Sequence, residues 1–109
     1  MNAEKLCEKC GFGVLALPAP DKEVSGAYVG DLLSWVMGRA DAGNVWITIM
    51  SNVNIVAVAT LADVCCIVLS EDVKPEEDII KLAEAKGVNL FNTPLPSYEA
   101  AIAVSEALK

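Results

Sequence analysis

The sequence predicts an α/β domain with a mainly parallel sheet and helices on both faces. From residue 45 onward, extended apolar stretches alternate with helical patterns, which is typical of right-handed crossovers between parallel strands. Residues 65–69 are apolar throughout, as expected for a strand that is covered on both faces. Neither an internal repeat nor a linker interrupts the 109 residues, so we expect one domain over residues 1–109.

The first part of the chain predicts a short helix and two strands. Residues 3–10 have helical spacing of their apolar side chains, and Gly11 is suited to end that helix. Val14–Leu17 is expected to be a short strand closed by prolines, and Val24–Val29 a second extended stretch.

A second helix is expected directly after these strands. Asp31 is a good N-cap, because its carboxylate can accept a backbone N–H two or three residues later. The apolar stripe expected to face the core is Leu32, Leu33, Val36, Met37 and Ala40.

The central stretch runs from Val45 to Asp63. Val45–Ile49 is rich in β-branched residues and predicts a strand, followed by a polar turn at residues 50–53. Residues 54–62 are apolar on almost every side, and periodicity alone does not separate strand from helix there. We expect a helix, because a strand would need two tight reversals without a Gly or Pro to make them.

The next helix carries clear terminal signals. Pro75 suits a first helical turn, the acidic residues at 76–78 favour the positive end of the helix dipole, and Lys86 favours the negative end. Gly87 is the expected C-cap. The side expected to be buried consists of Ile79, Ile80, Leu82 and Ala83.

A last strand and helix complete the pattern. Val88–Phe91 predicts the strand, and Ser97 is expected to cap the helix that follows. The expected inner face of this helix is Tyr98, Ala101, Ile102, Ser105 and Leu108.

Composition disfavours two classes of partner and favours a third. Hydrophobic residues make up 54% of the chain and charged residues 21%, with a net charge of −7. So little surface charge indicates that apolar surface is buried against a second copy, so we expect a homodimer. Arg39 is the only arginine and the lysines are scattered, which disfavours nucleic acid and anionic membranes. No signal-peptide pattern opens the sequence, so we expect a cytoplasmic protein.

Polar residues follow the predicted strands where each one ends. Because ligands of open parallel sheets bind outside the carboxyl ends of the strands, this rim is a candidate site for a small anion. The alternative is that these are ordinary loop and cap residues. The candidate ligand-binding residues are Ser51, Asn52, Asn54, Thr93 and Ser97.

The sequence contains few signals of enzymatic chemistry. The chain has no histidine, no phosphate-binding G-x-x-x-x-G-K-[ST] loop and no dinucleotide-binding G-x-G-x-x-G after a strand. No Ser or Cys has a base at the spacing of a known nucleophile motif. We therefore expect a non-catalytic protein without a cofactor; an enzyme of unknown type is the weaker reading.

The cysteines leave a second hypothesis open. Cys7 and Cys10 form a C-x-x-C pattern, which is typical of redox or metal sites, so a redox or metal-linked accessory protein is the alternative function. Reduced cysteine is also a common apolar core residue. Cys65 and Cys66 are expected to point to opposite faces of a strand, which disfavours a shared metal ion.

Several stretches together resemble the DRTGG domain family. They are residues 28–34 (Y-V-G-D-L-L-S), 43–48 (G-N-V-W-I-T), 54–59 (N-I-V-A-V-A) and 93–95 (T-P-L) before a helix. Where many relatives have a Gly-Asp-Arg-like turn, this chain has Met50-Ser51-Asn52.

The resemblance implies a dimeric, non-catalytic α/β module that senses a small anionic metabolite or nucleotide, or binds a partner enzyme. Such domains occur alone, in the middle of long phosphate acetyltransferases, and between CBS domains of regulated pyrophosphatases. They are also similar to the N-terminal domain of HPr kinase/phosphorylase, whose kinase chemistry belongs to another domain. Some stand-alone members are encoded beside iron-only hydrogenase genes, so the resemblance also links the chain to hydrogenase or acetyl-phosphate metabolism.

Overall fold

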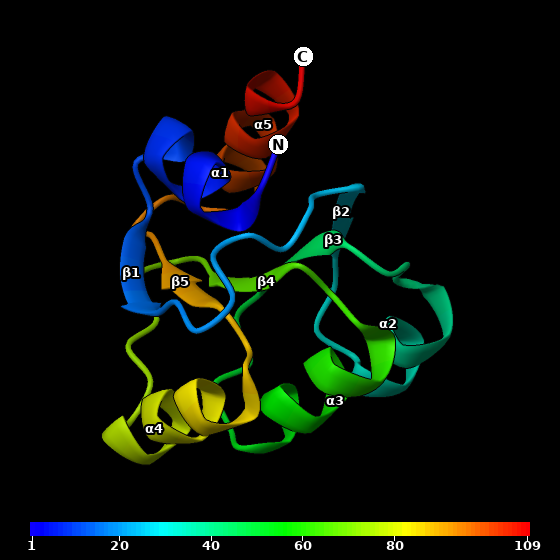
Figure 1. The fold of residues 1–109 in the computed structure, drawn as a ribbon, viewed down its shortest axis with the longest axis vertical. Coiled ribbons are helices and arrows are strands. Elements are labelled where there is room, and N and C mark those ends of the chain that lie inside the picture. The colour runs from blue at the N-terminus through cyan, green and yellow to red at the C-terminus, as the bar shows by residue number, and fades with distance from the viewer.

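A five-stranded sheet lies between two layers of helices in the structure, a computed structural model that describes residues 1–109 (Figure 1). The elements in chain order are α1 (Ala3–Cys10), β1 (Gly13–Ala16), β2 (Gly26–Val29), α2 (Leu33–Arg39), β3 (Asn44–Thr48), α3 (Asn54–Ala62), β4 (Cys66–Leu69), α4 (Glu77–Lys86), β5 (Leu90–Asn92) and α5 (Ser97–Ala107). None of the helices has the length and apolar composition needed to cross a bilayer.

The sheet is mostly parallel, which confirms the predicted fold class. The strand order is β1-β5-β4-β3-β2, and only the β1–β5 pair is antiparallel. From β2 to β5 each strand lies beside the previous one, in one direction across the sheet. Because crossovers between parallel strands are right-handed, the three connecting helices α2, α3 and α4 lie on the same face of the sheet.

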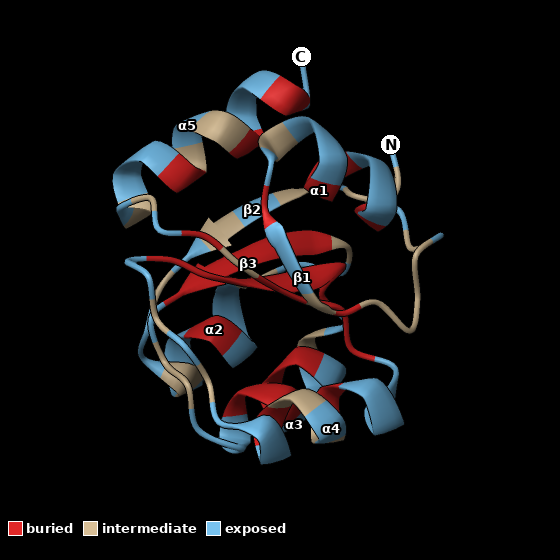
Figure 2. Ribbon diagram, turned by 90° about the vertical axis from the view of Figure 1, so that its left-hand side faces the viewer, coloured by how far each residue is buried: buried red, intermediate tan, exposed pale blue.

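Two cores fill the spaces on either side of the sheet (Figure 2). Helices α2, α3 and α4 cover one face, and helices α1 and α5 cover the other. β3 and β4 are buried along their whole length, and the apolar run at residues 65–69 predicts this burial for β4. The largest fully buried side chains include Trp46 and Phe91, one in each core.

The helix expected at residues 54–62 is confirmed over that range as α3. Residues Ile55, Val56, Val58 and Ala59 are buried, and the helix ends at Asp63 in the left-handed conformation. The glycine expected to end α4 is confirmed as well, because Gly87 adopts φ 74°. That helix begins at Glu77, so Pro75 precedes it and does not occupy its first turn.

The prediction for the second helix is wrong at its start and on its inner face. α2 begins at Leu33 without a side-chain cap, because the Asp31 carboxylate binds elsewhere. Only Val36 of the expected stripe is fully buried, and Leu32 and Met37 are exposed. The helix lies beside α3 at one end of its layer (Figure 1). Of its side chains, Val36 is buried in the core, and Leu33 packs against it in part.

The predicted inner face of the last helix is also wrong. Ala100, Val104 and Ala107 face the core, whereas Tyr98 and Ile102 are exposed. α5 packs against α1 and over β2 and β3, and its buried face consists of small residues that allow this close approach.

Candidate functional site

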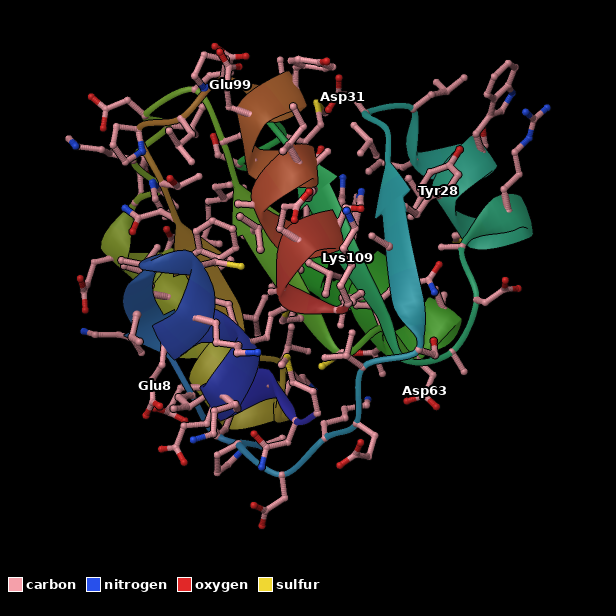
Figure 3. The ribbon with its side chains drawn as sticks, turned by 90° about the horizontal axis from the view of Figure 1, so that it is seen from above. Glu8, Tyr28, Asp31, Asp63, Glu99 and Lys109 are labelled. Carbon is pink, nitrogen blue, oxygen red and sulfur yellow. The ribbon has the colours of Figure 1, made fainter.

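The carboxyl ends of β2, β3, β4 and β5 meet at one edge of the molecule, which we call the rim. In Figure 3 the molecule is seen from above. Asp31 and Glu99 lie at the rim, and Asp63 lies toward the opposite end of the molecule. The loops that follow β3, β4 and β5 form the rim, as the parallel topology requires.

The loop after β3 presents unpaired backbone donors. The Asn52 carboxamide oxygen accepts from the Asn54 amide at 2.9 Å, and the Asn52 carbonyl accepts from the Ile55 amide at 3.3 Å. The amides of Ser51, Asn52 and Val53 donate to no protein group. Three consecutive N–H groups are therefore available beside the N-terminus of α3, where the helix dipole also favours an anion.

These residues border a cavity of about 430 Å³, which we call the rim hollow. Its lining comes from the β3–α3 loop, from the β4–α4 loop and from the start of α4. The Lys74 ammonium lies 3.0 Å from the Asp72 carboxylate and is largely exposed to solvent. The lining residues are Ser51, Asn52, Val53, Lys74, Glu76, Asp78 and Ile79.

Only some of the five residues predicted at the site share a cavity. Ser51 and Asn52 line the rim hollow, and Asn54 is exposed at the first position of α3, outside the lining. Thr93 is buried, and its hydroxyl accepts from the Leu95 amide at 3.3 Å. Ser97 lies at the start of α5, the helix that covers the other face of the sheet. The structure thus brings two of the five to one cavity.

Glu71 does the capping that was expected of Ser97. Ser97 is the first residue of α5, and its backbone amide donates to the Glu71 carboxylate at 2.9 Å. The Ser97 hydroxyl instead lies 2.6 Å from the Ser70 hydroxyl. The β4–α4 loop therefore holds the start of α5 in place, which sequence spacing could not indicate because the partners are 26 residues apart.

Asp31 also acts between loops. Its carboxylate accepts from the Thr48 hydroxyl at 2.8 Å and from the Ile49 amide at 3.1 Å. The Trp46 indole N–H donates to the neighbouring Gly30 carbonyl at 2.9 Å. These bonds hold the turn after β2 against the end of β3. The loop that contains Ser51 begins at this end of β3.

Sequence reasoning missed Lys74, Glu76 and Asp78 as part of the cavity. The acidic residues are explained by their position at the start of α4, where Glu76 is the N-cap residue and Asp78 lies in the first turn. One signal could have placed all three residues at the cavity. They come shortly after β4, and β4 is the neighbour of β3, whose following loop contains Ser51.

The cysteines lie away from the rim hollow. Cys7, Cys65 and Cys66 are buried together between the sheet and helices α1 and α5, and Cys10 packs against this core. The expectation that Cys65 and Cys66 point to opposite faces is wrong, because β4 begins at Cys66 and Cys65 belongs to the segment before it. No group of three His, Cys, Asp or Glu side chains is placed to hold a metal ion.

The thiol of Cys7 is poorly suited to redox chemistry. It donates to the Phe12 carbonyl at 3.3 Å, and burial, together with nearby Cys10 and Glu8, raises the pKa of Cys7 to about 11. Burial also raises the pKa of Cys10. Because the thiolate is the reactive form, these shifts do not favour the redox alternative.

A solved structure has the same architecture as this chain. It contains the CBS and DRTGG domains of the regulatory region of Clostridium perfringens pyrophosphatase, complexed with the activator diadenosine tetraphosphate. The match has a TM-score of 0.71 at 14% sequence identity, and it covers 97% of this chain and 46% of that one. The likeness at this identity is one of fold, and this chain spans less than half of the relative's length.

Comparison with protein-family profiles identifies the family, although no curated protein sequence matches the chain. The family profile described as the DRTGG domain matches residues 22–107, which include every element from β2 to α5. The family expected from residues 28–34, 43–48, 54–59 and 93–95 is thereby confirmed, and the chain belongs to the DRTGG domain family.

Proposed function

We propose that this chain is a non-catalytic regulatory module that works as a homodimer and senses a small anionic ligand at the rim hollow. The observation that carries the proposal is the run of three unpartnered amides at residues 51–53, beside Lys74. Membership of the DRTGG family and likeness to the regulatory region of a pyrophosphatase support a regulatory role.

A nucleotide suits the mixed charge of the rim hollow. Consecutive backbone amides at a helix N-terminus bind phosphate oxygens without help from arginine, and Lys74 adds one positive charge. Glu76 and Asp78 are acceptors for the hydroxyls of a ribose, as acidic residues are in other nucleotide sites. A bare inorganic anion would contact only the backbone amides and Lys74, because it has no ribose hydroxyls for the carboxylates. The pyrophosphatase relative is described with a dinucleotide activator, which supports the same class of ligand.

The absence of an activated nucleophile supports a binding role. The Ser51 hydroxyl makes no hydrogen bond to any side chain that could take its proton, and the chain has no histidine. A bound nucleotide would therefore be held at the rim hollow, where its phosphates would meet no hydroxyl nucleophile paired with a base.

A thermal-shift panel tests the ligand. The probes are ATP, AMP, diadenosine tetraphosphate, acetyl phosphate and inorganic phosphate, each added to the full chain. We expect the nucleotides to raise Tm more than acetyl phosphate or inorganic phosphate does. In titration calorimetry, Lys74→Ala should weaken the binding of the best probe by about tenfold, the usual value of one charge-assisted contact.

Lys9→Ala is the matched control, because Lys9 is an exposed lysine on α1, on the opposite face of the sheet. Binding that is lost equally in both variants would reflect net charge alone and contradict a site at the rim hollow. If no probe raises Tm, the anionic ligand is ruled out, and only a form of the proposal in which the module binds a partner enzyme is left.

A further inference from the structure

Helix α3 has an exposed side without a single charge. Its sequence from Asn54 to Ala62 contains no Asp, Glu, Lys or Arg, although Leu61 is 74% exposed. Val53, just before the helix, is 47% exposed. A helix whose outer side faces water normally carries charged residues there, as the neighbouring α4 does. Depletion of charge over an exposed apolar surface is typical of the centre of a protein interface.

The exposed side of α3 borders an apolar cavity between α3 and α4, which we call the α3–α4 groove. Its volume is about 370 Å³. Val53, Ala57 and Leu61 follow one another at four-residue spacing, so they form a stripe about 12 Å long at 1.5 Å per residue. The lining residues are Val53, Val56, Ala57, Thr60, Leu61, Leu82 and Lys86.

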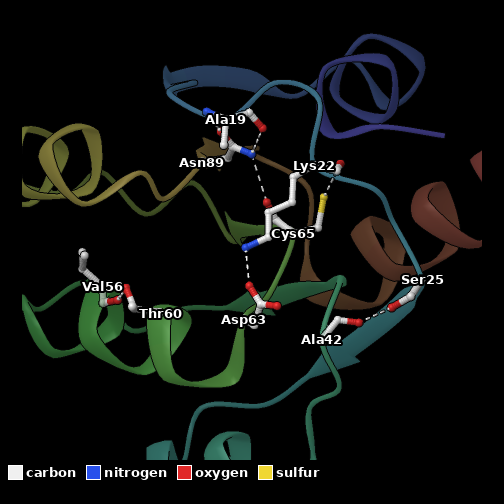
Figure 4. A network of polar contacts seen from close by, with 9 residues as sticks. All are labelled: Ala19, Lys22, Ser25, Ala42, Val56, Thr60, Asp63, Cys65 and Asn89. Carbon is white, nitrogen blue, oxygen red and sulfur yellow. Dashed lines mark hydrogen bonds and ion pairs between the residues drawn. The ribbon is translucent and has the colours of Figure 1, made fainter.

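The groove offers few polar groups to water or to a polar ligand. The Thr60 hydroxyl donates to the Val56 carbonyl of its own helix at 3.0 Å, as Figure 4 shows. Ala57, at the middle of the stripe, is small enough for another backbone to approach closely. An apolar helix surface therefore fits this groove better than a polar molecule does.

The two ends of the groove differ in net charge, because two carboxylates outnumber Lys74 at one end and Lys86 lies at the other. α3 and α4 run in the same direction, because each connects neighbouring parallel strands on the same face. Glu76 and Asp78 lie near Val53 at the starting end, and Lys86 lies near Leu61 at the other end. None of these three charged residues takes part in an ion pair within the chain.

We propose that the α3–α4 groove is the surface through which two copies of this chain pair, with their α3 helices antiparallel. The inference rests on the homodimer of the proposed function and names its interface. A two-fold axis through Ala57 places Leu61 of each copy over Val53 of the other, and Lys86 of each copy near Glu76 and Asp78 of the other. A dimer of this symmetry requires a surface that is complementary to itself, and the charge arrangement meets that requirement.

Sedimentation velocity of the full chain over a range of concentrations tests the interface. Leu61→Glu should weaken the dimer at least about tenfold, because it places two carboxylates in an apolar contact. The matched control is Tyr98→Glu, because Tyr98 is 75% exposed and lies on α5, on the opposite face of the sheet. The control should leave the dimer unchanged, and circular dichroism should show both variants folded.

A charge exchange tests the antiparallel arrangement. Lys86→Glu and Asp78→Lys should each weaken the dimer, and the double variant should recover most of the loss because the pair is restored across the axis. Recovery of this kind is not expected if both residues only face solvent. Failure of the double variant to recover, with every variant folded, contradicts the antiparallel arrangement.

The outcomes separate this inference from the proposed function. A wild-type dimer that withstands Leu61→Glu overturns the interface and leaves the homodimer standing. Dissociation by Leu32→Glu instead would place the interface at the β2 edge, where Leu32 is 58% exposed. A wild-type chain that stays monomeric at high micromolar concentration overturns both the interface and the homodimer, while ligand binding is decided separately by calorimetry.

Discussion

Asn89 shows how one side chain holds several segments together. It is almost fully buried, and its carboxamide nitrogen donates to the Ala19 carbonyl at 2.7 Å and to the Cys65 carbonyl at 3.0 Å. Its carboxamide oxygen accepts from the Ala19 amide at 2.9 Å. Figure 4 shows this contact between the β1–β2 connection and the starts of β4 and β5. Local sequence spacing does not reveal this contact, because the partners are far apart along the chain.

Asn89→Ala should lower the free energy of unfolding by about 3 kcal/mol, because it leaves buried backbone groups without partners. Urea unfolding measures the loss. Asn54→Ala is the control: Asn54 is exposed and its side chain makes no hydrogen bond, so we expect a change within about 0.5 kcal/mol. Equal losses in the two variants would contradict the role given to Asn89.

The buried thiol of Cys7 makes stability depend on alkaline pH. Burial raises the pKa of Cys7 from its ordinary 9.0 to about 11. Above pH 9 the unfolded chain loses this proton while the folded chain keeps it, so the unfolded state is favoured as the pH rises toward 11. The contribution is complete below pH 9. The contact between the Cys65 and Cys66 thiols, together with complete burial of Cys66, raises the pKa of Cys66, which acts in the same direction. The same contact lowers the pKa of Cys65, which acts in the opposite direction.

Urea unfolding between pH 8 and pH 10.5 measures this dependence. The wild-type chain should lose stability as the pH rises from about 9 to 10.5, and Cys7→Ala should lose less because one of the raised thiols is gone. The variant starts from its own stability at pH 8, so the slopes are compared and not the absolute values. Identical slopes would show that Cys7 ionises equally in both states.

At the scale of elements, the loop between β4 and α4 carries the strongest backbone constraint. Glu71 and Asp72 both adopt φ 60°, a left-handed conformation that L-residues rarely take. The Glu71 carboxylate caps α5, and the amides of Glu71 and Asp72 donate to the carbonyls of Leu95 and Thr93. The strained loop thus connects the rim hollow side of the sheet to α5.

Asp72→Gly should raise the free energy of unfolding by about 0.5–1 kcal/mol, because glycine adopts this conformation without a Cβ clash. The lost ion pair with Lys74 is exposed and contributes little. Glu71→Gly relieves the same strain but removes the cap of α5, so we expect it to be neutral or destabilising. Thermal unfolding compares the two, and a larger gain from Glu71→Gly would contradict the capping role.

The elements that were predictable from sequence are those with strong local signals. α3 followed from the missing turn residues around 54–62, and the end of α4 from Gly87. The start of α2 was not predictable, because Asp31 has the chemistry of an N-cap but binds Thr48 across the sheet. The inner face of α5 was missed because close packing selected its alanines over Tyr98 and Ile102.

At the scale of the molecule, alternation of strands and helices was enough to predict the sheet and its two helical layers. The site was predictable only in part. Parallel topology was enough to predict that Ser51 and Asn52 lie at the rim. It could not show that Thr93 and Ser97, which follow β5, make their contacts around the start of α5 and lie outside the rim hollow. Which cavity the rim encloses depends on loop conformation, and local sequence spacing does not encode it.

The amide resonances of residues 51–53 give the most direct test of the central claim, that this module holds a nucleotide phosphate on its backbone. The measurement is a titration of the ¹⁵N-labelled chain with ATP and with diadenosine tetraphosphate, followed by phosphorus spectra of the same samples. We predict that the amides of Ser51, Asn52 and Val53 shift and saturate while the nucleotides stay intact. Unmoved amides at these three positions, or cleavage of the added nucleotide, would contradict the account.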